Sequence, residues 1–456
     1  MASRLGLGGD QSLVNKRRRH LGKDTSGSHT QRAGAFFRAP KPQRNSTLML
    51  SLIFLPVLAL AQPPVLGDPA ATNLANQPIL SVLDGQPADL GFRAFYEDGL
   101  VFDWDGGNLV VEGLFEVGAY LNEGTEGKSR DPESDTYVKR MRPEFAGRFD
   151  GGWRFRFEPK FDESGVELEE AWVGREILDG DAVLRFGRMK APFGLEEIRS
   201  RRHIHFPRFS ILNQFSPAED HGVFVTGESG RFEYGYAVYN GTGGAEEDSG
   251  KDVALHGMWH SAAGGESAWQ VGAAATYGRQ DREVGGDGIS NAGGREVLQY
   301  ATDTRLNGDR LRFGLEGAWF QGPLMVQGEL LSVTQEMSNV GGEDVTISGF
   351  YVDVARSLTG EDLDFGGIED PTDSWLAALR VSRLSLSDEF EGTGLLMGGT
   401  FTDRIDSVSA GVNWVPNAHM ILRSAWTHSW YGETVAVGGE GVDDEGLLTI
   451  ELQLHF

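Results

Sequence analysis

The sequence predicts an all-β protein, a transmembrane antiparallel β-barrel of about 16 strands with a long loop folded into its lumen. The first observation behind this prediction is the C-terminal segment 448–456, where apolar side chains occupy every even position and polar ones every odd position, up to Phe456. Such alternation places the two sets on opposite faces of a sheet, one suited to lipid and one to water. Outer-membrane barrels alternate in this way and commonly end on such a strand.

The second observation is an export signal. The apolar run 48–60 follows two basic residues and ends in Ala59-Leu60-Ala61, the order of a signal peptide with an A-x-A cleavage site. It is too short to cross a bilayer as a helix, which takes about 20 apolar residues. We expect residues 49–61 to be the signal peptide, and residues 1–48 to be an upstream extension of the true start or a lengthened basic region.

The composition fits an exported envelope protein. The chain carries a formal net charge of −26, and residues 62–456 hold 65 acidic against 31 basic residues. This excess excludes nonspecific nucleic-acid binding, although the basic run Lys16–Arg19 could form a nucleic-acid arm in the precursor. The absence of cysteine excludes disulfides and thiolate metal sites. A mean hydropathy of −0.31 is too polar for a helical membrane protein but suits a barrel with a polar lumen.

The third observation is a series of alternating segments that recur about every 20 residues, as in a barrel with long loops. The clearest is 153–158 (WRFRFE), with aromatic side chains on one face and charged ones on the other. Turn sequences such as Asp150-Gly151-Gly152 and longer acidic stretches lie between the segments. We therefore assign residues 91–456 to the barrel and the proline-rich residues 62–90 to a linker.

The segment 198–218 is basic and aromatic and has no strand pattern. A cationic loop in an acidic protein is a candidate for a constriction inside the lumen, where low-dielectric walls focus its field on passing anions. The alternative is an exterior loop that contacts anionic lipopolysaccharide.

At these residues the chain resembles the phosphate-selective porin O and P family. The segment 186–197 (FGRMKAPFGLEE) resembles the family's FGR-x-K-x-PFGLE run, which precedes a loop folded into the pore. Further resemblances follow in order at 315–324 (LEGAWFQGPL), 349–352 (GFYV), 358–361 (LTGE), 375–388 (WLAALRVSRLSLSD) and 411–417 (GVNWVPN). They imply a trimeric 16-stranded outer-membrane barrel that passes small anions such as phosphate or polyphosphate.

The resemblance also suggests selectivity residues. The family's Arg-Arg pair on an early strand is matched by Lys139 and Arg140, and its Ser-Ser-Lys/Arg by Ser200-Arg201-Arg202. Its Glu-Arg pair corresponds to Arg208-Phe209, so the arginine is displaced by one position or lost. We expect the pore constriction to contain Lys139, Arg140, Arg201, Arg202 and Arg208.

The polar strand faces suggest a second group of residues, which would guide ions along the lumen wall: Arg154, Arg156, Arg312 and Arg380. The expected partners are small anions, outer-membrane lipid and lipopolysaccharide, the barrel-assembly machinery through Phe456, and two further copies of the chain. The alternatives are a weakly selective general porin, a plugged barrel with a structural or adhesive role, and a secreted β-sandwich.

No enzymatic or cofactor site is expected. His203-x-His205 could place two imidazoles on one face, but no third metal ligand is fixed by spacing. The pair Glu169-Glu170 is adjacent, so its side chains should diverge on a strand instead of facing each other as a glycosidase couple does. Acidic loops such as 443–445 could bind Ca²⁺ or Mg²⁺, although solvated loops are the simpler interpretation.

Overall fold

The structure is a computed structural model. It describes residues 92–97, 99–123, 135–243, 250–261, 267–339, 342–365, 367–368, 371–391, 393–397, 401–437 and 440–456. All of these belong to one compact unit, Val65–Phe456. The leader, signal peptide and linker expected within residues 1–90 lie outside the described residues and stay predictions.

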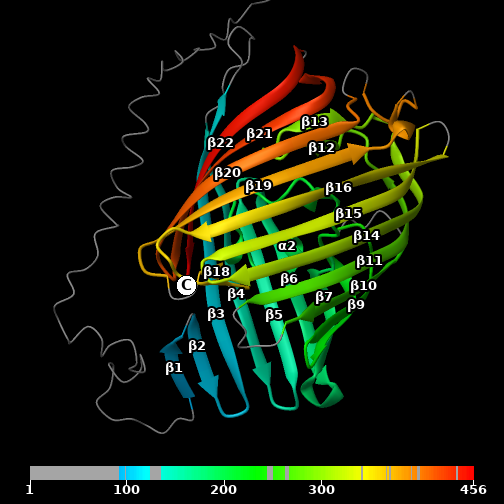
Figure 1. Ribbon diagram of the computed structural model, residues 1–456. Helices are drawn as coiled ribbons and strands as arrows, with labels where there is room; N and C mark the ends of the chain where they lie inside the picture. The colour runs from blue at the N-terminus through cyan, green and yellow to red at the C-terminus, as the bar shows by residue number, and fades with distance from the viewer. Residues whose placement is uncertain are drawn as a thin grey trace, which may run out of the picture. The chain divides into compact units, whose positions relative to one another are not determined.

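The described strands form a closed antiparallel ring of sixteen (Figure 1). They are β3 (Gly107–Glu123), β4 (Asp135–Phe149), β5 (Trp153–Asp162), β6 (Gly165–Ile177), β7 (Ala182–Lys190), β8 (Glu219–Ser229), β9 (Phe232–Tyr239), β10 (Asp252–His260), β11 (Ala268–Glu283), β14 (Arg305–Gln321), β15 (Leu324–Ser338), β16 (Gly342–Ser357), β19 (Ser374–Leu386), β20 (Arg404–Asn417), β21 (Met420–Val437) and β22 (Glu440–His455). Each strand pairs with its neighbour, and β22 pairs with β3 to close the ring. The predicted fold class is confirmed, and the soluble sandwich is excluded.

The alternation predicted from the sequence divides the two faces of the wall. On β5, Trp153 and Phe157 are about half exposed on the outside, whereas Arg154 and Arg156 form ion pairs. On β19 and β20, the outward rings of Trp375 and Trp414 stack with their centroids 6.1 Å apart. The outer face is therefore apolar with aromatic residues, as lipid requires.

The two ends of the barrel differ. One end, called the turn end here, carries the short connections 150–152, 230–231, 322–323 and 418–419 together with Phe456. A long connection at this end, 358–373, contains the short strands β17 (Leu363–Asp364) and β18 (Gly367–Ile368). The other end, the loop end, carries long connections such as 284–304 and 387–403. Short turns are typical of the periplasmic end and long loops of the extracellular end.

The first two strands extend the wall at the turn end. β1 (Phe92–Tyr96) pairs with β2 (Leu100–Trp104), and β2 pairs with residues 107–111 of β3. Directly beyond this stretch, the backbone of Phe456 exchanges two hydrogen bonds with Gly113. The start of the described chain and its last strand therefore share one edge of β3.

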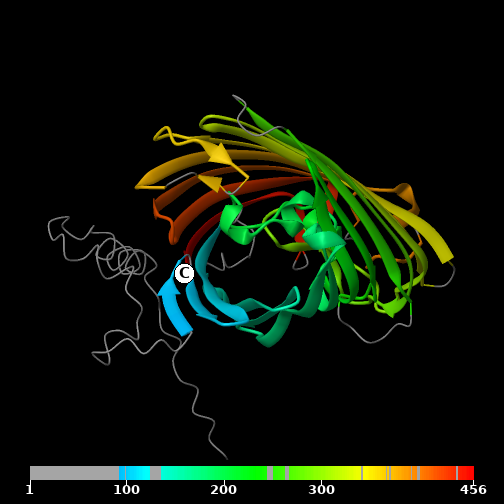
Figure 2. The same cartoon turned by 90° about the horizontal axis from the view of Figure 1, so that it is seen from below.

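Three connections pack inside the ring. The lumen loop, residues 191–218, contains α2 (Leu195–Ile198), η4 (Arg201–His203) and η5 (Asn213–Phe215), and Figure 2 shows it within the ring of strands. From the loop end, β12 (Gly288–Ser290) with β13 (Glu296–Gln299), and η6 (Asp388–Phe390), bury apolar side chains such as Leu298 and Phe390. The last short element, η3 (Leu178–Gly180), lies between β6 and β7.

The apolar clusters inside the barrel lie mainly against β14–β16 and β19–β21. Phe206 and Leu195 of the lumen loop pack there with Leu376 and Ala425 of the wall. By contrast, the inner face of β3–β6 carries Arg142, Glu144, Glu158 and other charged side chains. One half of the lumen is therefore filled by loops, and the other half keeps a charged wall.

No helix among the described residues is long and apolar enough to cross a membrane.

We predict that Leu379→Arg destabilises the barrel. Leu379 is 47% exposed on the outer face of β19, midway between Trp375 and Arg383. An arginine at the bilayer midplane costs about 2–4 kcal/mol in barrels of this kind. Urea unfolding in lipid vesicles measures the loss. The control is Leu358→Arg in the exposed connection at the turn end, for which we expect a change within about 0.5 kcal/mol; equal effects at both positions would contradict the membrane placement.

Candidate constriction in the barrel lumen

The lumen loop turns inward directly after β7. Ala191 and Phe193 are almost completely buried, and Gly194 adopts a φ of +81°, a value that glycine tolerates better than other residues. The next two backbone N–H groups, of Leu195 and Glu196, donate to the carboxylate of Glu329 on β15. The FGLEE sequence therefore makes a tight inward turn whose free donors are satisfied by the opposite wall.

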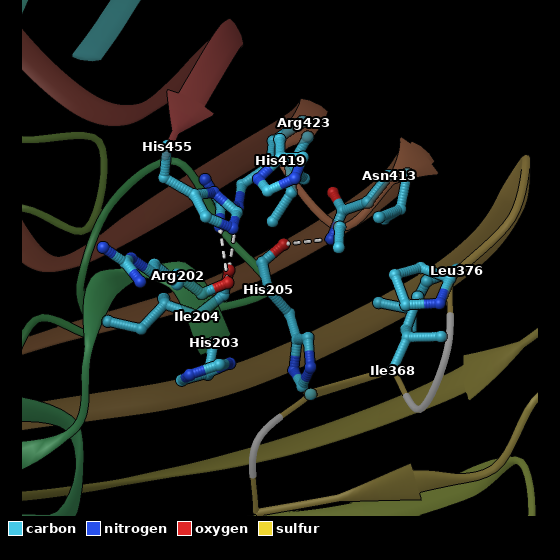
Figure 3. Close-up of a pocket in the computed structure, with 15 residues that line it drawn as sticks. Arg202, His203, Ile204, His205, Ile368, Leu376, Asn413, His419, Arg423 and His455 are labelled. Atoms are coloured by element: carbon cyan, nitrogen blue, oxygen red, sulfur yellow. Dashed lines mark hydrogen bonds between the residues drawn. The ribbon is translucent and has the colours of Figure 1, made fainter. Parts of the chain in front are cut away.

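Wall arginines hold the loop backbone in place. Arg423 of β21 donates to the carbonyl oxygens of Ile204, Arg201 and Arg202 at 2.8, 3.2 and 3.3 Å. It is 1% exposed and also bonds Gln453 at 2.8 Å. In an irregular loop, many carbonyl groups lack the backbone hydrogen bonds that a helix or sheet would supply. The guanidinium N–H groups of Arg423 supply these hydrogen bonds instead (Figure 3).

Two arginines predicted to line the wall have similar contacts. Arg380 forms ion pairs with Asp353 at 2.6 Å and Glu196 at 2.7 Å and donates to the carbonyl of Arg208 at 3.3 Å. Arg312 donates to the carbonyl of Phe215 at 2.9 Å. Both are buried against the loop. Their expected role in guiding ions stays a prediction; the contacts indicate a role in positioning the loop.

Lys139 and Arg140 both face the lumen because β4 contains a bulge. Glu116 pairs with Arg140 and Val117 with Val138, so Lys139 is an extra residue between them. A bulge turns two consecutive side chains toward one face. A second bulge, opposite Glu158 and Pro159, does the same for Glu169 and Glu170. The expectation that these two glutamates diverge is wrong, since Glu169 lies 3.4 Å from Arg142 and Glu170 3.5 Å from Arg156, both on the inner face.

Three of the five predicted constriction cations have close carboxylate partners. Lys139 lies 2.5 Å from Glu451, Arg140 lies 2.9 Å from Glu116, and Arg202 lies 2.6 Å from Glu112. Arg140 also lies 3.9 Å from Glu169. The acidic partners come from β3, β6 and β22, and they were not predicted as site residues. For Glu451, the sequence did contain a useful feature: the alternating pattern of the terminal strand placed its side chain on the polar face.

The other two cations are different. Among the residues that the structure describes, neither Arg201 nor Arg208 has a carboxylate oxygen within 4.0 Å. Arg201 lies over the ring of Phe209, with its guanidinium carbon 3.7 Å from the centroid, so Phe209 at the divergent family position supports this arginine by a cation–π contact. The Nε atom of Arg208 is buried without a hydrogen-bond partner. The carboxylates within 4.0 Å of the other three cations are Glu112, Glu116, Glu169 and Glu451, so within the described residues only Arg201 and Arg208 of the five lack a close acidic partner.

The charged wall beside the loop contains the remaining predicted arginines. Arg156 lies 2.8 Å from Glu144 and 3.0 Å from Glu158, and Arg154 is ion-paired with Glu176. Arg142, which the sequence analysis missed, belongs to the same network through Glu158. Arg142 is two residues after Arg140 on β4, so its side chain lies on the same inner face. It was missed because it belongs to none of the family motifs that the sequence resembles.

The histidines of the loop are electrically neutral at ordinary pH. Burial, with a smaller contribution from the positive charge of Arg199, lowers the pKa of His203 to about 4 and that of His205 to about 3. Burial, followed by the charge of Arg140, lowers the pKa of Arg201 to about 10, so it remains charged at pH 7. Within the described residues, no group of three or more His, Cys, Asp and Glu side chains is arranged to hold a metal ion.

Comparisons with known proteins identify the family. The model described as phosphate-selective porin O and P matches residues 119–456. The chain belongs to this family. It is therefore an outer-membrane porin and not an enzyme, as predicted. Among curated proteins, it is 22% identical to Porin O of Pseudomonas aeruginosa over 304 residues, which cover 58% of this chain and 68% of that protein.

Solved structures share the fold of this porin. An anion-selective porin from Comamonas acidovorans matches with a TM-score of 0.52 and 12% identity, over 77% of this chain and all of the other. The outer-membrane expressed OmpT of Vibrio cholerae matches with a TM-score of 0.50 and 12% identity, over 78% of this chain and all of the other. At this identity the likeness shows the barrel fold alone.

We predict that Arg423→Met releases the lumen loop. The substitution keeps the length and apolar stem of the side chain but leaves three loop carbonyls and the nearby Glu451 without this donor. Removing one partner of a buried ion pair costs about 3–5 kcal/mol. Limited trypsin digestion with mass spectrometry should detect faster cleavage between residues 199 and 208. Arg383→Met, on the outer face, is the control; equal cleavage rates in the two variants would argue against the positioning role.

We also predict that acid loosens the loop. Because the folded-state pKa values of His203 and His205 lie below the ordinary 6.5, the unfolded loop binds more protons below pH 6.5, and loop stability falls from there toward pH 4. Because neither trypsin nor pepsin is active over the whole range, amide hydrogen exchange of residues 199–208, corrected for its intrinsic pH dependence, should measure the loss between about pH 6.5 and pH 4. The double variant His203→Asn, His205→Asn should lose most of this pH dependence. An unchanged profile in that variant would assign the effect to other groups.

Proposed function

We propose that this porin passes small anions by passive diffusion, past the cations of the lumen loop and of the charged inner wall of β3–β6. The observation that carries the proposal is the pair Arg201 and Arg208, two guanidinium groups at the loop that have no carboxylate oxygen within 4.0 Å in the described part of the chain. Low-dielectric walls strengthen the field of such charges, which attracts anions and repels cations.

The paired cations have a second role in this mechanism. Lys139, Arg140 and Arg202 share their charge with carboxylates, so each offers a weaker site than a free guanidinium. Weak sites suit conduction, because an ion must leave as readily as it enters. Arg154 and Arg156 would continue this series of weak sites along the wall.

Phosphate or polyphosphate-like anions are the proposed solutes. The family description names phosphate, and a guanidinium group offers a planar fork that matches two phosphate oxygens. Lys139 lacks that fork, and Phe209 stands where the resemblance places an arginine. These two departures favour a second candidate, a weakly selective general porin that takes chloride and phosphate alike.

The plugged-barrel alternative is less well supported. The loops that fill the lumen pack against β14–β16 and β19–β21, and their clusters are apolar. The inner face of β5 instead carries Arg154 and Arg156, whose side chains are 40% and 30% exposed, which suits a wall in contact with water. We further propose a homotrimeric assembly, lipopolysaccharide contacts at the loop end, and recognition of Phe456 by the assembly machinery.

We predict that Arg201→Gln together with Arg208→Gln removes most of the anion preference. The reversal potential of the purified protein in a planar bilayer under a KCl gradient measures it. Loss of two unshared charges should move the potential toward that of a nonselective pore, and block by phosphate should weaken. Arg93→Gln on β1 is the control. An unchanged reversal potential in the double variant would contradict the proposed pathway, and a cation-selective parent would contradict the function.

We predict a comparable change for Lys139→Ala with Arg140→Ala. This double variant removes two positive charges, as the Arg201 and Arg208 variant does, and it leaves Glu451 and Glu116 in the lumen without these partners. In the same bilayer measurement, the reversal potential should therefore move away from anion selectivity by a similar amount. Selectivity equal to that of the parent would remove these residues from the constriction.

A further inference from the structure

The connection 284–304 at the loop end sends the β12–β13 hairpin into the barrel, where it meets the lumen loop. The backbone N–H of Ser290 donates to Oε1 of Gln214 at 2.9 Å, and Nε2 of Gln214 donates to the carbonyl oxygen of Ser290 at 3.0 Å. Ile289 of the hairpin is 1% exposed and belongs to the same apolar cluster as Leu212 of the lumen loop. The two inward segments are therefore joined to each other.

The same hairpin is also tied to the wall strands β21 and β22. Asn291 is 5% exposed, and its Nδ2 donates to the hydroxyl of Tyr431 at 2.9 Å and to the carboxylate of Glu445 at 3.1 Å. Its Oδ1 accepts from the backbone N–H of Arg295 at 3.1 Å, and the guanidinium group of Arg295 is ion-paired with Glu445. The turn between β12 and β13 is therefore fixed between the lumen loop and the wall.

Gly294 lies in this turn, directly against the guanidinium group of Arg208. Its φ is +79°, and its N–H donates to the carbonyl oxygen of Asn291 at 2.9 Å. A Cβ atom at this position would lie 2.6 Å from Cζ of Arg208 and closer still to its Nη1. Both distances are far shorter than van der Waals contact, so any side chain here would displace the guanidinium group.

The side chain of Arg208 is not fixed by an ion pair. In the described part of the chain, no carboxylate oxygen lies within 4.0 Å of it. Its backbone carbonyl accepts from Arg380 at 3.3 Å, which holds only the main chain. Between Arg208, Ala292 and the wall residues Thr427 and Thr449, a cavity of about 10 Å³ leaves room for about one water molecule. The guanidinium group therefore has too little room to move toward β21 and β22.

We propose that the β12–β13 turn positions the guanidinium group of Arg208 in the constriction, and that Gly294 is needed there because it has no side chain. An arginine without an ion-pair partner samples several rotamers unless its surroundings exclude them. A fixed charge beside low-dielectric groups acts more strongly on passing anions than a charge that turns into water. The effect on selectivity rests on the proposed function, whereas the contact itself does not.

The contact also bears on the departure from the family pattern. Arg208 stands one position before the place that the family resemblance gives to this arginine, and Phe209 occupies that place. The hairpin turn holds the displaced guanidinium group by close packing, in a position where no ion pair among the described residues does so. Gly294 is therefore a positioning residue that acts through Arg208.

Gly294→Ala tests the contact, and Gly286→Ala is its matched control. Both glycines lie in the connection 284–304 with a positive φ, +79° and +91°, but a Cβ at Gly286 would have no atom within 4 Å. Phenylglyoxal labelling of arginines, read by mass spectrometry on the purified full chain in detergent, measures the accessibility of Arg208. Arg93 on β1, whose side chain is 73% exposed, is the internal reference. Heat-modifiable gel mobility confirms that each variant folds as a barrel.

We expect the labelling rate of Arg208 to rise several-fold in Gly294→Ala and to stay at the parent's value in Gly286→Ala. Gln214→Leu removes both hydrogen bonds to Ser290 without changing the charge, and it should give a smaller rise. This second variant decides the matter if Gly294→Ala does not fold. Equal labelling of Arg208 in the parent and in the folded variants would overturn the proposal.

The reversal potential under a KCl gradient measures the consequence for selectivity. Gly294→Ala should move it toward that of a nonselective pore, by less than Arg208→Gln does, because the charge is displaced but not removed. In the Arg208→Gln background, Gly294→Ala should cause no further shift, since the turn acts through this arginine. The same shift in both backgrounds would overturn the positioning role. A parent without anion selectivity would instead contradict the proposed function, and the labelling rates would still decide whether the turn positions Arg208.

Discussion

The arrangement of the lumen depends on guanidinium groups of the wall that bind backbone carbonyls of the loop. Arg423 and Arg380 hold the segment from Arg201 to Arg208, and Arg312 holds Phe215. Without these donors, an irregular loop in the middle of a barrel would leave its carbonyl groups unsatisfied. Arginines on β14, β19 and β21 therefore hold the loop against that side of the barrel.

The same interaction explains why the acid-rich chain can still present positive charge. Asp353 and Glu196 neutralise Arg380, and Glu451 and Gln453 contact Arg423, so the arginines that position the loop contribute little net charge to the lumen. On β3, Glu116 likewise pairs with Arg140, whereas Glu451 of β22 is shared between Lys139 and Arg423. The positive charge that has no close acidic partner among the described residues is concentrated at Arg201 and Arg208 on the loop. Overall net charge is therefore a poor guide to the field at a constriction.

The fold was largely predictable from the sequence, because strand alternation is a local signal that repeats along the chain. The outward aromatic residues of 153–157 and the inward position of Glu451 follow from a period of two, and the number of strands follows from the length of the chain and the recurrence of such segments. The bulges at Lys139 and Glu169 were not predictable, since an extra residue reverses the faces without leaving a mark in the composition.

The ion-pair partners of the site residues were the feature that the sequence predicted least well. Arg202 meets Glu112 across 90 positions, and Arg380 meets Glu196 across 184. These pairs arise from ring closure and from the path of the loop, which spacing in the sequence does not encode.

The shared edge of β3 has a consequence for the geometry of the whole ring. The last residue paired on that edge from the C-terminal side is Gly113, and the first paired with β2 is Val111, so only Glu112 separates the two strands. A slide of the closing strand toward the turn end would bring Phe456 into the place of Leu100. The β1–β2 hairpin thus occupies the edge of β3 that such a shift would need, and it keeps β22 in its register with β3. This register contributes to the shear of the barrel, which sets the strand tilt and the diameter.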